Sequence, residues 1–215
     1  EPLLRESDIV VRYQGGGMGY TLRTQDGSYR FRLLPEGLKY PGKVCVLGDG
    51  MVIDLESLRH EISMMRYFHR PIGPENLKIS ARAVILLPFY IRQGVLARQL
   101  EGIPASENSR QGFSYAYSDK SLKQALRMGD LLHLDLPVVR QRLRTCIDLK
   151  NLVFTKVYGD QPLDYREMVR WAEEQAAFFA PYICAAGRFL TDAASEDKNI
   201  LFTSQFGALL DLDYG

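Results

Sequence analysis

Short hydrophobic runs alternate along the chain with stretches in which apolar residues recur at helical spacing. Near the start, β-rich runs predict strands at residues 8–13, 20–24, 29–34 and 43–47. Glycine-containing turns follow the first and the last of these runs, at 15–19 and 48–50. A helix is expected over 55–68, because four apolar residues recur there at i, i+3, i+7 and i+10 and Asp54 is a suitable N-cap.

The rest of the chain has mostly helical patterning. An apolar run predicts a buried strand over 77–90, and the polar stretch 102–118 predicts a loop. Helices are expected at residues 92–101, 121–132, 137–150 and 164–191, the last interrupted at Pro181. A further strand is expected at 200–202. Because strands alternate with helices, the sequence predicts the α/β class.

Composition and charge argue against two classes of partner. The 215 residues include 27 Lys and Arg against 26 Asp and Glu, a formal net charge of +1. Nucleic-acid and membrane-surface binding both favour a basic face, so we expect neither. No stretch approaches the roughly 20 apolar residues of a membrane span. The basic run at 140–144 is interpreted as a solvated helix face, with a partner surface as the alternative.

The residue types that bind metals are scattered. The three cysteines are widely spaced and form no CxxC pair: Cys45, Cys146 and Cys184. This spacing disfavours a disulfide framework or a structural zinc site and predicts reduced core thiols in a cytosolic protein. The three histidines show no metal-ligand spacing either: His60, His69 and His133. Asp211 and Asp213, two apart in an extended stretch, are either a cation site or solvated carboxylates.

Three glycine-bearing turns follow apolar strands, at 15–19, at 48–50 and around Gly207. Glycine at a strand end lets backbone N–H groups approach a phosphate or a metal closely. The sequence nevertheless holds neither a complete GxGxxG fingerprint nor a Walker A motif. Tight turns without a ligand would explain the same glycines. The residues alone therefore indicate a cytosolic α/β domain, for which nucleotide binding is one interpretation.

Taken in order, several segments resemble the motifs of the adenylosuccinate synthetase family. Residues 10–16 are VVRYQGG and are followed by Gly19, Tyr20 and Thr21, where the family has VVRYQGG running into NAGHT. The other matching segments are 33–37 (the family's hLxPSG), 46–52 (IGNGVV), 79–90 (SxRAHxxLPYH), 116–131 (AYEDK and RVGDL) and 202–215 (FEGAQGxLLDIDxG). Motifs in the same order cover nearly the whole chain, which makes the resemblance specific.

The resemblance implies a fold, a reaction and partners. The family's fold is a central mixed β-sheet flanked by helices and related to P-loop NTPases. We take residues 1–215 as a single domain of this kind, truncated at both ends relative to the family. The family's enzymes join IMP to aspartate, using GTP and Mg²⁺ to phosphorylate the purine O6. They are cytoplasmic homodimers in which the partner subunit lends an arginine to the IMP phosphate.

Site residues carry over from the family by position. Gly19 matches the glycine whose carbonyl helps hold Mg²⁺, and Thr21 matches the threonine beside the GTP phosphates. Ser109 stands where the family has a threonine on the IMP phosphate. Lys123 stands at the position of the partner-donated arginine and keeps the charge without the bidentate fork. The family's catalytic histidine is replaced by Tyr20.

Departures from the family gather where its chemistry lies. The phosphate loop GDEGKGK would precede Leu3 and is absent from the chain, and with it the base carboxylate and a phosphate-binding lysine. The histidine of LPYH is Tyr90, and the segment EGAQG is TSQFG at 203–207. We therefore expect that this chain by itself does not make adenylosuccinate.

Three interpretations of the chain remain open. It is the N-terminal half of a ligase, a non-catalytic paralogue that acts as a nucleotide-binding or protein-assembly module, or a divergent ligase for another purine or amine. Bound IMP or GTP would favour the first interpretation. The third would need a phosphate-binding loop from elsewhere.

Overall fold

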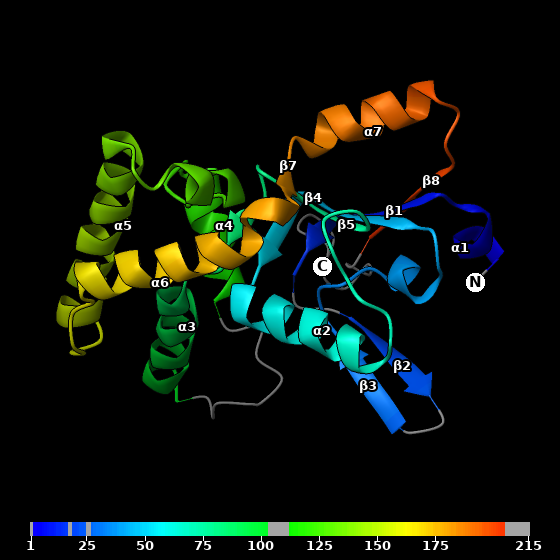
Figure 1. Ribbon diagram of the computed structural model, residues 1–215. Helices are drawn as coiled ribbons and strands as arrows, with labels where there is room; N and C mark the ends of the chain where they lie inside the picture. The colour runs from blue at the N-terminus through cyan, green and yellow to red at the C-terminus, as the bar shows by residue number, and fades with distance from the viewer. Residues whose placement is uncertain (1, 17–18, 25–26, 103–111, 205–215) are drawn as a thin grey trace. The chain divides into compact units, whose positions relative to one another are not determined.

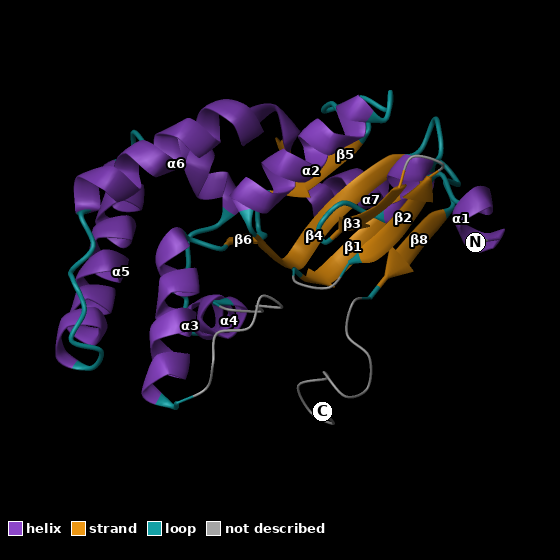
Figure 2. Ribbon diagram, turned by 90° about the horizontal axis from the view of Figure 1, so that it is seen from below, coloured by secondary structure: helices purple, strands orange, loops and turns teal. Residues whose placement is uncertain are grey.

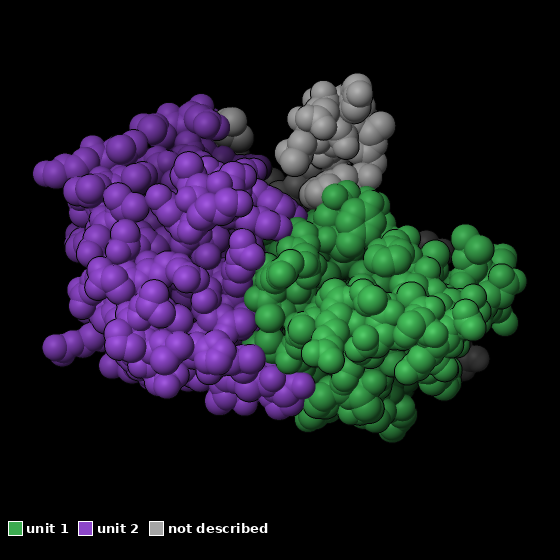
Figure 3. All heavy atoms as spheres, turned by 90° about the horizontal axis from the view of Figure 1, so that it is seen from above, with its two compact units in different colours: residues 1–83, 182–215 green, residues 84–181 purple. Residues whose placement is uncertain are grey.

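The computed structural model describes residues 2–16, 19–24, 27–102 and 112–204. Its chain forms two compact units, which we describe separately (Figure 3). Unit 1 consists of residues 1–83 and 182–215, and unit 2 of residues 84–181. The expectation of a single domain over 1–215 stays a prediction.

Unit 1 is built on a parallel sheet with the strand order β7-β5-β4-β1-β8. The strands are β1 (Ile9–Gly15), β4 (Val44–Ile53), β5 (Leu77–Ser80), β7 (Ile183–Cys184) and β8 (Ile200–Thr203). All four pairings along this path are parallel. The α/β class is thereby confirmed. The resemblance implied a mixed sheet, but these four pairings are all parallel. Parallel neighbours need long crossover connections, and the segments between these strands supply them.

Helices cover both faces of this sheet. α2 (Leu55–Tyr67) lies on one face and α7 (Ala186–Ser195) on the other (Figures 1 and 2). α2 buries its four periodic apolar residues, as predicted: Leu55, Leu58, Ile62 and Met65. The predicted N-cap is also confirmed, because the Asp54 carboxylate accepts a hydrogen bond from the Ser57 backbone at 3.2 Å. Unit 1 also contains two short helices: α1 (Pro2–Glu6), which precedes β1, and η1 (Glu36–Lys39), which precedes β4.

An antiparallel hairpin forms a second, two-stranded sheet in unit 1. It consists of β2 (Tyr20–Thr24) and β3 (Gly27–Phe31), with Tyr20 opposite Phe31. The sequence predicts the second strand to continue to residue 34, but β3 ends at Phe31. Beyond this point the backbone amides hydrogen-bond to a side chain instead of to β2.

The predicted turn at 48–50 is wrong, because these residues lie inside the ten-residue strand β4. Glycine is needed there for close approach rather than for a turn. A Cβ atom at Gly50 would lie 2.2 Å from the Tyr13 carbonyl oxygen on the neighbouring strand. The register between β1 and β4 also shifts between Arg12 and Gln14, so the two strands meet at an irregularity.

Unit 2 is mainly helical. Its elements are β6 (Val84–Ile85), α3 (Pro88–Leu100), α4 (Phe113–Ser121), η2 (Met128–His133), α5 (Pro137–Lys156) and α6 (Tyr165–Phe179), and η3 (Ala180–Tyr182) runs from its end. The helices predicted at 92–101 and 137–150 are confirmed. α3 begins earlier than predicted, at Pro88, and α5 begins at Pro137 as predicted and continues to Lys156.

Two predictions for this part of the chain are wrong, and a third is confirmed. The apolar run 77–90 is not one strand, because it bends after Ser80 and enters α3 at Pro88. The stretch 121–132 is not one helix, because α4 ends at Ser121 and Lys123 has a left-handed φ of 63°. The long helix 164–191 divides at the expected break: α6 ends at Phe179, and β7 separates it from α7.

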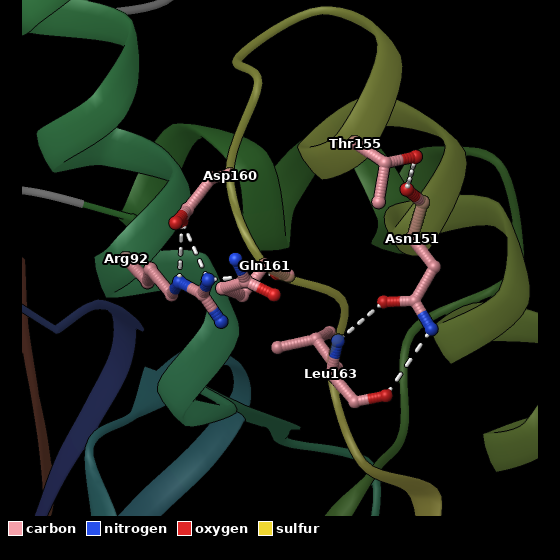
Figure 4. A network of polar contacts seen from close by, with 6 residues as sticks. All are labelled: Arg92, Asn151, Thr155, Asp160, Gln161 and Leu163. Carbon is pink, nitrogen blue, oxygen red and sulfur yellow. Dashed lines mark hydrogen bonds and ion pairs between the residues drawn. The ribbon is translucent and has the colours of Figure 1, made fainter.

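Side-chain hydrogen bonds hold the connection between α5 and α6 (Figure 4). Arg92 on α3 donates from Nε to the Asp160 carboxylate at 2.7 Å and from its terminal nitrogen to the Gln161 carbonyl at 2.7 Å. Asn151 on α5 accepts from the Leu163 amide at 2.6 Å and donates to the Leu163 carbonyl at 3.2 Å. These contacts give the loop a defined path without regular secondary structure.

Two buried charged side chains hold the segment that follows β3. Glu61, on α2, accepts hydrogen bonds from the backbone amides of residues 32–34, at 2.7, 3.1 and 2.9 Å. Arg12, on β1, donates to the carbonyls of Leu33 and Leu34 at 2.9 and 3.3 Å. Both side chains are only 5% exposed. The charges therefore replace the hydrogen bonds that a longer β3 would have made.

Replacing Glu61 by Ala should destabilise the chain strongly. Two buried amides and one partly buried amide would lose their acceptor, and a buried unsatisfied group costs about 1–3 kcal/mol. We expect a loss of at least about 3 kcal/mol in the free energy of unfolding, measured by urea denaturation, and a smaller loss for Glu61→Gln. Glu56→Ala, on the exposed side of the same helix, is the control. A loss for Glu61→Ala no larger than for this control would contradict the assignment.

All three cysteines are free, in agreement with the prediction of reduced thiols. Burial raises the pKa of Cys45 to about 12 and that of Cys146 to about 11. Burial also raises the pKa of Cys184, which is partly exposed.

We expect at most one thiol to react with Ellman's reagent in the native chain at pH 8, because the thiolate is the reacting species. All 3 cysteines should react in denaturant. The absorbance of the released thionitrobenzoate counts them. Rapid reaction of two thiols in the native state would show that Cys45 or Cys146 is accessible.

Candidate functional site

The carboxyl ends of the parallel strands in unit 1 gather polar side chains. The Ser80 hydroxyl, at the end of β5, donates to the Asp49 carboxylate on β4 at 2.5 Å. The Gln14 side-chain amide, on β1, donates to the Ser204 hydroxyl just after β8 at 2.8 Å. In open α/β sheets, ligands bind outside the carboxyl ends of the strands. This edge is therefore the candidate site of unit 1.

The charges at this edge are balanced. The Arg82 guanidinium lies 3.8 Å from the Asp49 carboxylate, and its side chain is 76% exposed. Beside these groups two aromatic rings pack edge to face, Tyr13 and Phe202, with centroids 6.5 Å apart. The edge thus offers donors, acceptors and aromatic surface. No group of three or more His, Cys, Asp or Glu side chains suited to a metal occurs among the residues that the structure describes.

Gly19 precedes β2, and its backbone packs tightly against the end of β3. A Cβ atom at this position would lie 1.6 Å from the Phe31 carbonyl oxygen and 2.6 Å from the Arg32 Cα atom. Any side chain here would force the hairpin away from its present path. Steric contact therefore requires glycine at this position whether or not a ligand binds there.

Tyr20, at the family's histidine position, and the predicted site residue Thr21 begin β2. Tyr20 pairs with Phe31 and Thr21 with Arg30 across the hairpin, and Thr21 is exposed. The structure thus places Gly19, Tyr20 and Thr21 at one end of the hairpin in unit 1.

The remaining predicted site residues lie elsewhere in the chain. Lys123 belongs to unit 2, where it is exposed and follows α4 in a left-handed conformation. Ser109 lies outside the described residues. So do Gly207, Asp211 and Asp213, on which a glycine turn and an alternative cation site were predicted.

The basic run on α5 makes contacts within unit 2. Arg140 donates to Glu173 at 2.9 Å, and Arg142 donates to Asp130 at 2.9 Å. The Arg144 guanidinium lies 3.8 Å from the centroid of the Tyr165 ring. These intramolecular contacts favour the interpretation as an ordinary helix face.

A buried polar network in unit 2 was missed by sequence reasoning. The hydroxyl of the fully buried Tyr90 donates to the Asp119 carboxylate at 2.8 Å, and the Lys150 ammonium lies 3.0 Å from the same oxygen. Burial raises the pKa of the Tyr90 phenol. The available signal was position, since Lys150 follows Cys146 and Leu143 at helical spacing on the buried side of α5.

Comparisons with known proteins agree with this architecture. The family model described as adenylosuccinate synthetase matches residues 1–215. The adenylosuccinate synthetase of Exiguobacterium sp. is 35% identical over 215 residues, which cover 99% of this chain and 49% of the relative. That of Caldanaerobacter subterraneus is 34% identical over 214 residues, covering 99% of this chain and 50% of the relative.

The structure gives the same result. The fully ligated adenylosuccinate synthetase from Plasmodium falciparum superimposes with a TM-score of 0.81 at 25% identity, covering 99% of this chain and 49% of that one. The chain thus spans about half the length of these relatives. Among the described residues, no helix combines the length and apolarity that crossing a bilayer requires. Matching motifs, parallel sheet and superposition agree, and the chain belongs to the adenylosuccinate synthetase family.

Proposed function

We propose that this chain is the nucleotide-binding scaffold of an adenylosuccinate-synthetase-type ligase and that it does not make adenylosuccinate by itself. The family drives the ligation of IMP and aspartate with GTP and Mg²⁺. The observation that carries the proposal is Tyr20, which stands at the family's catalytic histidine position on the first residue of β2.

The loss follows from the chemistry of the two side chains. An imidazole can be cationic near neutral pH, whereas a phenol has an ordinary pKa near 10 and stays neutral. The negative charge that develops on a phosphoryl group during its transfer would no longer be stabilised by a cationic side chain at this position. Deleting a single transition-state donor costs about 3 kcal/mol, or a factor of about 100 in rate. Tyrosine in place of histidine at position 20 should therefore lower the rate of phosphoryl transfer more than it lowers the affinity for nucleotide.

Nucleotide binding would use the residues that the family assigns by position. Gly19 and Thr21, together on the hairpin, would face the GTP phosphates. Ser109 would contact the IMP phosphate of its own subunit, and Lys123, at the position of the partner-donated arginine, would reach the IMP phosphate of the partner subunit. Lys123 supplies one compact charge in place of the arginine fork, so it binds phosphate with less directional hydrogen bonding.

The described residues by themselves do not fit a protein-built Mg²⁺ site. Magnesium prefers octahedral oxygen ligands and commonly takes one or two carboxylates in addition to phosphates. Gly19 offers only a backbone carbonyl, and Asp49 already accepts a hydrogen bond from Ser80.

The proposed assembly is a cytoplasmic homodimer, as in the family. Exposed leucines in unit 2 support an interface there. Leu122, beside Lys123, is 61% exposed, and Leu149 and Leu152 on α5 are 42% and 59% exposed. The same apolar surface favours the alternative function, that of a non-catalytic paralogue serving as a nucleotide-binding or protein-assembly module.

The purified 215-residue chain should not convert IMP, GTP and aspartate to adenylosuccinate. Tyr20→His should raise the rate of adenylosuccinate formation by less than a few-fold above background. The reason is that the 215 residues contain no GDEGKGK loop to supply the base carboxylate. Product absorbance near 280 nm measures the rate. Turnover by the unmodified chain, or a large rescue by this single change, would contradict the proposal.

A thermal-shift series tests nucleotide binding separately. IMP at 100 times its Kd should stabilise the chain by about 2.7 kcal/mol and raise Tm by roughly 5 °C. Lys123→Ala should abolish most of the shift at the same IMP concentration, and Lys123→Arg should increase it. Lys156→Ala, also exposed in unit 2, is the charge-matched control. An absent shift with IMP and GTP alike would leave the assembly module as the better function.

A further inference from the structure

Tyr90 holds both ends of α4. At the N-terminal end, Gly112 has a φ of 95°, and a Cβ atom there would lie 2.6 Å from the Tyr90 carbonyl carbon. At the other end, the Tyr90 hydroxyl donates to Asp119 at 2.8 Å. One buried residue on α3 thus contacts the residue before α4 and its last turn.

Asp119 joins this contact to a second helix. Its two carboxylate oxygens lie 3.0 and 3.1 Å from the Lys150 ammonium of α5, whose side chain is 11% exposed. The same ammonium lies 5.2 Å from the centroid of the Tyr90 ring. A hydroxyl, a carboxylate and an ammonium thus satisfy one another with little access for water, which makes the arrangement costly to disturb.

The backbone of Asp119 also fixes the turn after α4. Its carbonyl oxygen accepts hydrogen bonds from the amides of Gln124 and Ala125, at 2.8 and 3.2 Å. Lys123 lies inside this turn with a φ of 63°, and its own amide donates to the Lys120 carbonyl at 3.1 Å. The bonds from Gln124 to Asp119 and from Lys123 to Lys120 are those that commonly close a helix C-terminus around a left-handed residue.

We propose that Tyr90, Asp119 and Lys150 form a positioning network that fixes the Lys123 turn, so that the lysine meets a nucleotide phosphate from a defined Cα position. The inference rests on the proposed function for the role of Lys123. Tyr90, Asp119 and Lys150 are positioning residues, since they lie inside unit 2 and act on the phosphate only through the turn.

The network matters more with lysine than it would with arginine. A lysine has a flexible four-carbon stem and a point charge, so it gains no orientation from a planar fork. A turn that is already fixed removes the backbone conformational entropy that ordering it on phosphate binding would otherwise cost. Tyrosine at position 90 also differs from the family's histidine: it donates the hydrogen bond to Asp119 without titrating near neutral pH.

The first test needs no ligand. Hydrogen–deuterium exchange should show the amides of Gln124 and Ala125 exchanging at least tenfold faster in Tyr90→Phe, which removes one hydroxyl and keeps the ring. Tyr90→His, which keeps a donor, should restore most of the protection. Tyr67→Phe, at a residue that is 70% exposed, is the control and should change nothing. Unchanged exchange in Tyr90→Phe overturns the inference whatever the result with IMP.

The second test separates positioning from general stability. IMP titration calorimetry should show a three- to tenfold weaker affinity for Tyr90→Phe in the parent chain and no further loss in a Lys123→Ala background. An equal loss in both backgrounds would mean that Tyr90 supports the fold without acting through Lys123, and would overturn the inference.

The two proposals fail in different ways. If Lys123→Ala binds IMP as tightly as the parent chain, the phosphate contact is wrong and the functional part of the inference falls with it. If no variant binds IMP while Tyr90→Phe still loosens the turn, the nucleotide function is wrong and the hydrogen-bonded positioning of Lys123 stands. Asp119→Asn provides a second variant should Tyr90→Phe fail to fold.

Discussion

The buried amides of residues 32–34 need an acceptor, and the Glu61 carboxylate provides it. Arg12, on β1, donates to carbonyls of the same segment. Side chains from β1 and α2 thus hydrogen-bond the backbone of residues 32–34, which pairs with no strand that the structure describes. β3 ends immediately before this segment. Two buried charges therefore hold the point at which the hairpin ends, opposite the start of β2 with Gly19, Tyr20 and Thr21.

Sequence patterning was informative where one physical effect dominates. The apolar stripe of α2 and its Asp54 cap required only local periodicity and a hydrogen bond three residues away. The start of α5 at Pro137 was predicted correctly, whereas α3 begins at Pro88, four residues before the predicted start. The apolar run 77–90 misled because a buried strand and a buried helix start share the same composition.

The errors that affect the candidate site had tertiary causes. Glycines at 48 and 50 suggested a turn, but their small size serves the approach of β1 to β4. Asp119 and Lys150 lie 31 positions apart, and only the tertiary structure shows that they neutralise each other. Helical spacing places Lys150 on the buried side of α5 but does not identify its partner. The family motifs identify the positions of Gly19, Thr21 and Lys123, whereas the contacts that hold the hairpin and the Lys123 turn depend on tertiary structure.

The contact at Gly19 has a consequence for how this protein can be studied genetically. Alanine scanning assumes that removing or adding a methyl group probes what a residue does for a ligand. At position 19 the smallest possible side chain would overlap the Phe31 carbonyl oxygen, 1.6 Å away. A loss of function in a scan would then report a displaced hairpin and say nothing about metal or phosphate. Only replacement of the backbone carbonyl itself, for example by an ester, would isolate a role for that oxygen.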